Sequence, residues 1–301
     1  MDPELCTLET CSIDDAYIHY QPSIAANSVF IALFGLLLVV QAVLTPVYRM
    51  WGFSGSMVVG LVLEVIGYAA RVLFHDDPFN FDYFLMNLIC LSLGPVFFCA
   101  AIYFLLGRIV IAYHGEDISR LRPRTYAIFF VSCDVIALIM QSAGGAITSV
   151  AEDADMQNTG VNVMIAGLAF QVAALTLFIA LATEFAYRLR RRSRAGHPTV
   201  SSKTGKDEYV HIRDRAFWKL FLAGLVAATI TVYTRSIFRV IELNGGYDSE
   251  IANDEIAFMV LEGAMVGITC ICLTALHPGI ALKTRYQKKD RELLRENVEM
   301  S

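Results

Sequence analysis

This sequence contains seven apolar runs, each of about the length that crosses a bilayer as an α-helix. A spanning helix needs about 20 predominantly apolar residues, and lipid offers a lone strand no partner for its backbone groups. The runs are Ile24–Val47, Met57–Phe74, Phe84–Tyr113, Thr125–Val150, Val161–Phe185, Phe217–Ile241 and Ile256–Leu276. The sequence therefore predicts an all-α integral membrane protein, a bundle of seven transmembrane helices within residues 22–280.

The distribution of charge supports this class. Only 18% of the residues are charged, against about 25% in a soluble domain, and they gather in short blocks between the apolar runs. A soluble helical protein would instead spread its charges along every amphipathic helix. No block combines basic and aromatic residues as a nucleic-acid surface does, so we expect no nucleic-acid partner.

The connecting segments alternate in sign along the chain. Residues 1–21, 75–82, 151–160 and 243–254 are acidic and contain no Lys or Arg. The alternate segments are basic, most clearly the loop 188–215 and the tail 281–301. Because Lys and Arg accumulate in cytoplasmic segments, the N-terminus is predicted to lie outside the cytoplasm and the C-terminus inside.

Two cysteines, Cys6 and Cys11, fall in the acidic N-terminal tail. A disulfide between them is permitted outside the cytoplasm, and two separate free thiols are the other interpretation.

Ionisable and amide side chains also occur within the apolar runs or at their ends. Such groups are costly in lipid, face the bundle interior and commonly mark function. We expect most of them to meet in one polar cavity in the outer half of the membrane, with Asp134 nearer the cytoplasm. The candidates are Asn27, Glu64, Tyr68, Arg71, Tyr103, Asp134, Gln141, Gln171, Arg235, Arg239, Glu242, Glu255 and Glu262.

Charge and spacing leave two interpretations of these candidates. Their five acids outnumber their three arginines, which would suit a cationic headgroup. Pairs such as Arg71–Glu64 or Arg239–Glu262 would instead lock helices together. Pro95 interrupts the third run and frees backbone groups that must be satisfied nearby.

Short motifs occur in order along the runs between Tyr17 and Gly279. They are Tyr20-x-Pro22-Ser23-x-x-x-Asn27, Glu64-x-x-Gly67-Tyr68-x-x-Arg71, Ala101-Ile102-Tyr103-x-x-x-Gly107-Arg108, Asp134-x-x-x-x-x-x-Gln141-x-x-Gly144-Gly145, Gly167-Leu168-x-x-Gln171, Arg235-x-x-Phe238-Arg239-x-x-Glu242-x-x-x-Gly246, and Glu255 followed by His277-Pro278-Gly279. Together they resemble the fungal lipid-translocating exporter family, also called RTA-like proteins. In the last run, Phe258 and Glu262 stand where the family pattern has a tyrosine and an aspartate.

The resemblance implies a translocator of sphingoid long-chain bases or related toxic amphiphiles, in the plasma membrane or an endomembrane. Its partners would be membrane lipids and an amphipathic substrate. No Gly-x-x-x-x-Gly-Lys-Ser/Thr motif occurs, so direct ATP drive is not expected. The sequence leaves the oligomeric state open.

Three other function classes are compatible with seven membrane-spanning helices. A seven-helix receptor or sensor of lipids is the alternative, although the third run ends in Arg108-Ile109-Val110 rather than an acidic-Arg-Tyr triplet. A porphyrin or haem transporter, using His277 or His75, is third. No histidine lies mid-membrane or four residues from another, so we expect no metal site and no enzyme.

Overall fold

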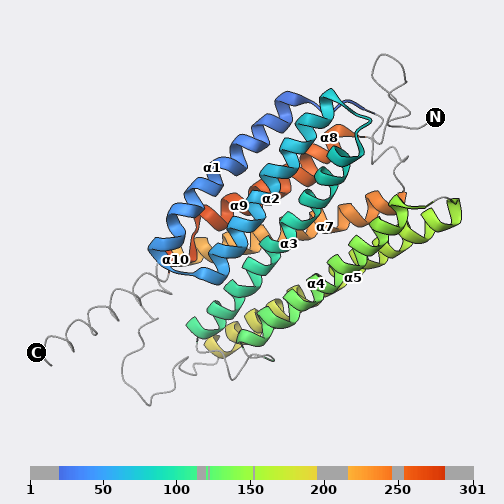
Figure 1. Ribbon diagram of the computed structural model, residues 1–301. Coiled ribbons are helices and arrows are strands. Elements are labelled where there is room, and N and C mark those ends of the chain that lie inside the picture. The colour runs from blue at the N-terminus through green and yellow to red at the C-terminus, as the bar shows by residue number, and fades with distance from the viewer. Residues whose placement is uncertain are drawn as a thin grey trace, which may run out of the picture.

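The computed structural model describes residues 20–113, 120, 123–151, 153–194, 216–245 and 254–281. Seven helices in these ranges are long and apolar enough to cross a membrane, and the described residues contain no strand. The predicted all-α integral membrane fold is confirmed (Figure 1). The elements are α1 (Ile24–Tyr48), α2 (Trp51–Asp76), α3 (Phe81–Ala112), α4 (Pro123–Ser149), α5 (Ala154–Arg194), α7 (Ala216–Gly245), α8 (Glu255–Phe258), the π-helix η3 (Met259–Ala264), α9 (Met265–Ala275) and α10 (Pro278–Ala281).

The helices form one bundle with α3 near its centre. The helix α2 packs between α1 and α3, while α7 packs against α9. The helices α4 and α5 form a closely packed antiparallel pair along one side, which meets the rest of the bundle through α3 and α7 (Figure 1). Of the seven spans, α3 is the most buried and α1 the least, so the interior is built around α3.

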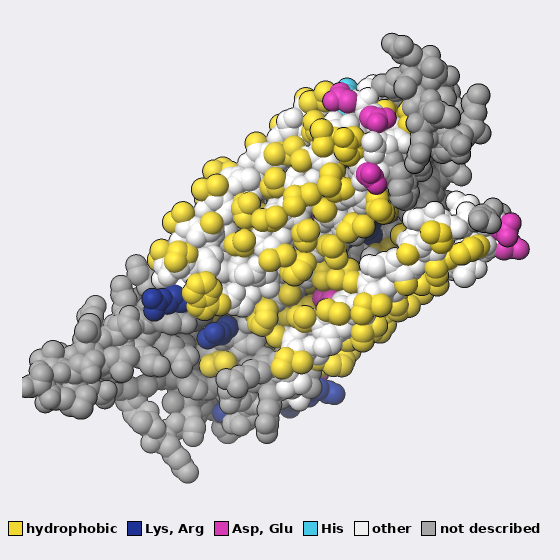
Figure 2. Space-filling model, in the orientation of Figure 1, with side chains coloured by type: hydrophobic (Ala, Val, Ile, Leu, Met, Phe, Trp, Pro, Cys, Tyr) yellow, Lys and Arg dark blue, Asp and Glu magenta, His cyan; other side chains and the backbone are white. Residues whose placement is uncertain are grey.

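The outer surface of the bundle is apolar, as a lipid-facing surface must be. On α1, Val29, Leu36 and Val43 are each at least 60% exposed, which would be unfavourable in water. Figure 2 shows hydrophobic side chains covering the length of the bundle, with Asp and Glu near the end where the N-terminus lies and Lys and Arg near the opposite end. The charge alternation along the sequence therefore appears in space as two oppositely charged ends.

The helix α5 is longer than the sequence predicts. It continues to Arg194, into the segment expected as the basic loop 188–215. Leu and Arg are good helix formers, and Glu184 pairs with Arg188 one turn later and with Arg120 at 2.9 Å. The remainder of that loop, the tail 282–301, and Cys6 and Cys11 lie outside the described residues.

The α4–α5 pair is held by close backbone contact at glycines. A Cβ on Gly144 would lie 2.6 Å from the carbonyl oxygen of Gly160, and one on Gly167 would lie 2.9 Å from that of Ala137. Both are shorter than atoms in contact allow, so only glycine permits this approach. The pair is consequently a compact unit flanking the interior.

Candidate functional site

Four charged side chains and a tyrosine are enclosed at the centre of the bundle. Glu64, Tyr68 and Arg71 come from α2, Arg235 from α7 and Glu262 from η3, and each is at most 2% exposed. We call these five residues the buried charge cluster. It contains two acids and two arginines, so it is balanced when all four are ionised. Buried charges persist in a low-dielectric interior when they are paired and hydrogen-bonded.

Arg235 connects α7 to both η3 and α3. It forms an ion pair with Glu262, and its Nη2 donates to the carbonyl oxygen of Leu91 at 2.7 Å. That carbonyl would normally accept from the residue four positions later, but the residue there is Pro95, which has no N–H. Arg235 therefore satisfies the backbone group that Pro95 leaves free.

Glycines make room for the cluster. A Cβ on Gly94 would lie 3.0 Å from Cδ of Glu64 and closer still to its Oε1, while one on Gly263 would lie 2.8 Å from the Tyr68 hydroxyl. The Tyr68 ring stacks on Phe30, with ring centroids 5.0 Å apart. These contacts fill the space around the carboxylate and the phenol.

Arg71 closes the cluster at the end of the bundle where the N-terminus lies. Its guanidinium lies 3.7 Å from the centroid of the Phe258 ring, a cation–π contact, and its Nη2 donates to the Tyr20 hydroxyl. Burial raises the pKa of the Tyr20 hydroxyl above its usual value of 10.0, and this outweighs the lowering effect of the Arg71 guanidinium. Tyr20 is therefore a neutral phenol when its hydroxyl accepts the hydrogen bond from Arg71.

Asn27 and Glu255 stabilise helix starts. The Asn27 Nδ2 donates to the Ser23 carbonyl at 2.7 Å, and Glu255 Oε1 accepts from the Ser23 backbone N–H at 2.6 Å. The contact with Glu255 satisfies a backbone N–H at the start of α1, where helical partners are missing, and joins α1 to α8. The contact of Asn27 lies within α1 and adds a second donor to a carbonyl that already accepts from the Asn27 backbone N–H.

The π-helix changes the geometry of the last span. Glu255 and Glu262 are seven residues apart, which on an α-helix places them on one face. A π turn takes an additional residue for each hydrogen-bonded ring, so η3 shifts the phase between them. As a result Glu255 contacts Ser23 of α1 and Glu262 contacts Arg235 of α7.

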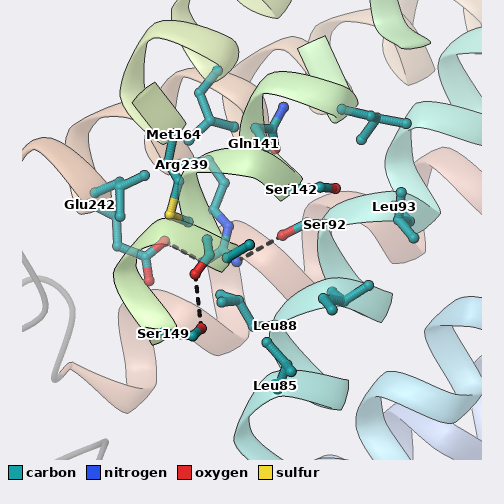
Figure 3. A pocket seen from close by; sticks show the side chains of 16 residues that line it. Leu85, Leu88, Ser92, Leu93, Gln141, Ser142, Ser149, Met164, Arg239 and Glu242 are labelled. Atoms are coloured by element: carbon teal, nitrogen blue, oxygen red, sulfur yellow. Dashed lines mark hydrogen bonds and ion pairs between the residues drawn. The ribbon is translucent and has the colours of Figure 1, made fainter. Parts of the chain in front are cut away.

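A cavity of about 240 Å³ lies between α3, α4, α5 and α7, in the half of the bundle nearer the acidic end. We call it the lateral cavity (Figure 3). Figure 2 shows the surface hollowed between α3 and the α4–α5 pair. Apart from leucine, isoleucine, methionine, alanine and glycine, the residues lining it are Ser92, Gln141, Ser142, Ser149, Arg239 and Glu242.

An ion pair lies in the wall of the lateral cavity. Arg239 Nη1 lies 2.8 Å from Glu242 Oε2, and Nη2 donates to the Ser92 hydroxyl at 3.1 Å, as drawn in Figure 3. Across the cavity, Gln141 donates to Gln171 Oε1 at 3.1 Å. The cavity therefore offers a carboxylate, a guanidinium, hydroxyls and an amide beside apolar walls.

Tyr103 on α3 and Asp134 on α4 occupy a third place, on the side of the lateral cavity nearer the basic end. Their exposures are 0% and 1%. The Tyr103 hydroxyl lies near the Asp134 carboxylate, but neither group completes a hydrogen bond within the described part of the chain.

The predicted polar residues thus occupy four places instead of one shared cavity: the buried charge cluster, the lateral cavity, the Tyr103–Asp134 place, and the start of α1, where Asn27 and Glu255 lie. Arg71 contacts Tyr20 and Phe258 rather than Glu64, and Glu262 pairs with Arg235. The roles of all thirteen residues in substrate binding stay predictions. Sequence reasoning missed Ser92, Ser142 and Ser149, because a serine in an apolar run carries no signal of the cavity it faces.

The histidines considered for porphyrin have protein neighbours. His277 is fully buried with its ring centroid 5.1 Å from that of Tyr48 and 5.3 Å from that of Phe53, and its Nδ1 accepts from the Gly279 N–H at 3.0 Å. His75 Nδ1 lies 2.6 Å from the Pro22 carbonyl oxygen. In the ranges that the structure describes, no three His, Cys, Asp or Glu side chains are grouped to hold a metal.

A bundle of seven apolar spans with charged groups built into its interior defines a polytopic integral membrane protein. Residues 57–285 match the family model described as RTA1 like protein, and this chain belongs to that family, as its motifs predict. No solved structure matches the chain significantly.

Relatives of this chain occur in Saccharomyces cerevisiae. The "Sphingoid long-chain base transporter RSB1" is 31% identical over 283 residues, which cover 88% of this chain and 74% of the relative. "Protein RTM1" is 27% identical over 70% of this chain and 63% of its own length. "Protein RTA1" is 28% identical over 72% and 65%.

Proposed function

We propose that this protein is a translocator of amphiphiles of the sphingoid long-chain-base class, and that it holds their headgroup in the lateral cavity. It acts in the plasma membrane, with the acidic end of the bundle outside, and it is neither an enzyme nor directly driven by ATP. Its partners are membrane lipids and an amphipathic small molecule. The relative named as a sphingoid long-chain base transporter supports the substrate class.

The single observation that carries this proposal is the mixed lining of a cavity hollowed into the lipid-facing side of the bundle. A long-chain base has an ammonium group, hydroxyls and a long apolar chain. Glu242 offers the ammonium a carboxylate, and Ser92 and Gln141 offer partners for hydroxyls. Leucines of α3 and α4 border the same space, so the chain can remain in lipid beside them.

The Arg239–Glu242 pair suits exchange of partners. An incoming ammonium can take the place of Arg239 at the Glu242 carboxylate, while Arg239 keeps its hydrogen bond to Ser92. Both side chains are partly exposed, at 12% and 14%. Such a pair is weaker than an enclosed one, which favours reversible binding there.

The buried charge cluster has a structural role in this proposal. The contacts of Arg235 join α3, α7 and η3. The locking interpretation therefore applies to Arg235 and Glu262, and the binding interpretation to Arg239 and Glu242.

Transport by the purified full chain in liposomes tests the proposal. We expect a fluorescent long-chain base to cross the bilayer faster than in protein-free liposomes, and Glu242→Gln to slow it by about tenfold, as for the loss of a charged contact. The matched control is Asp155→Asn, which changes an exposed acid at the start of α5 and should leave the rate unchanged. A wild-type chain that moves no long-chain base contradicts the proposal.

A further inference from the structure

The seam between α3 and α4 continues beyond the lateral cavity toward the basic end of the bundle. Leu138 and Gln141 line the cavity, and Figure 3 shows Gln141 at its wall. Asp134 precedes Leu138 by four residues on α4, so it lies about 6 Å further along the same face. Asp134 is therefore the next ionisable group of α4 beyond the cavity.

Asp134 differs from the other enclosed acids. Glu262 is paired with Arg235. Glu64 forms no ion pair with the described residues and has an unpartnered oxygen, but it lies within electrostatic range of both Glu262 and Arg235, whereas no arginine acts on Asp134. Both oxygens of Asp134 lack a hydrogen-bond partner, and no cation of the described residues forms an ion pair with it. A carboxyl group enclosed in this way is costly until a cation or a proton neutralises it. A proton, or a cation that is not one of the described side chains, must therefore neutralise the Asp134 carboxylate.

Three aromatic rings pack against one another beside Asp134, since one of them belongs to Tyr103, whose hydroxyl lies near the Asp134 carboxylate. The ring centroids of Tyr103 and Phe178 are 4.6 Å apart, those of Tyr103 and Phe130 are 5.4 Å apart, and those of Phe130 and Phe178 are 5.3 Å apart. Phe130 is one helical turn beyond Asp134 on α4. A carboxylate beside several aromatic faces is the chemistry that recognises an ammonium ion. The Tyr103 hydroxyl, which also has no hydrogen-bond partner among the described residues, adds an acceptor.

We propose that Asp134 and Tyr103, with the rings of Phe130 and Phe178, form a second station that takes a primary ammonium headgroup after it leaves the lateral cavity. This inference rests on the proposed function. Phe130 lies one turn nearer the basic end than Asp134 on α4, so a headgroup held at the station must pass this ring to continue.

The test uses two fluorescent probes with the same long chain, one ending in a primary amine and one N-acetylated. In liposomes containing the full chain, Asp134→Asn should slow the amine by about tenfold relative to the acetylated probe. Asp155→Asn, at an exposed acid, is the matched control and should change neither rate. Because the asparagine removes an unpaired buried carboxyl, the thermal midpoint of Asp134→Asn should be unchanged or higher.

Two outcomes overturn the station. One is equal slowing of both probes together with a lower thermal midpoint, which indicates a structural role for Asp134. The other is an amine rate that the substitution leaves unchanged.

A second measurement separates failure of the station from failure of the proposed function. If the wild-type chain moves neither probe, the proposed function fails, and the station is judged by ligand-induced stabilisation in detergent. Dodecylamine should then raise the thermal midpoint more than dodecanol does, and Asp134→Asn should abolish the difference. A difference that survives the substitution, or none in the wild type, contradicts the station.

Discussion

Arg235 and Arg239 lie one turn apart on α7 and reach two consecutive residues of α3. Arg235 donates to the Leu91 carbonyl at 2.7 Å, and Arg239 donates to the Ser92 hydroxyl at 3.1 Å. The first arginine is 2% exposed and paired with Glu262, whereas the second lines the lateral cavity. Two arginines of α7 thus contact neighbouring residues of α3, but one is enclosed in the bundle and the other lines a cavity.

This relationship predicts losses of stability of very different size for the two arginines. Arg235→Ala leaves Glu262 and the Leu91 carbonyl without their partner, so we expect the free energy of unfolding to fall by about 3–5 kcal/mol. Arg239→Ala disrupts a partly exposed pair and should lower it by less than about 1 kcal/mol. Denaturant titration of both variants in mixed micelles measures the two values. Equal losses would contradict the division between an enclosed cluster and an open cavity.

Gly94 is predicted to be essential for the position of Glu64. A methyl group at this position overlaps the Glu64 carboxyl, so Gly94→Ala should lower the free energy of unfolding by about 1–3 kcal/mol through overpacking. Gly35→Ala on α1 is the matched control, because nothing lies within 4 Å of its Cβ. The control should be neutral or stabilising by up to about 1 kcal/mol. The contact assigned to Gly94 is wrong if both variants unfold alike.

The ring of Phe258 is predicted to stabilise Arg71. Phe258→Leu removes the aromatic face 3.7 Å from the guanidinium, which we expect to lower the free energy of unfolding by about 0.5–2 kcal/mol. Phe258→Tyr keeps an aromatic face and should retain most of this stability. The same micelle titration compares them, and a leucine variant as stable as the tyrosine variant would show that the ring contributes only its volume.

Two neighbouring glycines of α4 are predicted to differ. Gly144→Ala places a methyl group 2.6 Å from the Gly160 carbonyl oxygen and should force α4 and α5 apart, at a cost of about 1–3 kcal/mol. The nearest atom to a methyl group on Gly145 is the Met164 sulfur at 4.0 Å, so Gly145→Ala should unfold like the wild type. Thermal unfolding of the two variants in one detergent decides this, and a destabilised Gly145→Ala would argue against the packing described.

The fold was largely predictable because each membrane-spanning helix is specified locally. Every apolar run gave a spanning helix, since a segment in lipid must satisfy its own backbone groups. The departures are local. Propensity and the Glu184–Arg188 pair extend α5 to Arg194. The π-helix η3 inserts a phase shift between Glu255 and Glu262 that spacing in the sequence does not reveal.

Some residues that line the lateral cavity, such as Gln141, Arg239 and Glu242, stood out in the sequence, but the grouping of the polar residues was not predictable. Pro95 indicated that a carbonyl would need a new partner, but not that Arg235, 140 positions later in the sequence, would supply it. Likewise, Gln141 and Arg239 both stood out as polar residues in apolar runs, and their meeting at one cavity depends on how α4 and α7 pack around α3.

The sequence by itself determined the number of membrane-spanning helices and the residues that are too polar to face lipid. Both depend only on the free energy of moving one segment from water into lipid, which its own residues set. Only the tertiary structure decided which polar residue meets which. That choice depends on helix rotation, on the phase shift at η3 and on close approaches at glycines such as Gly94 and Gly144, none of which a single helix contains. The same packing that encloses Arg235 with Glu262 leaves Arg239 at a cavity, and Asp134 with no cation among the residues that the structure describes.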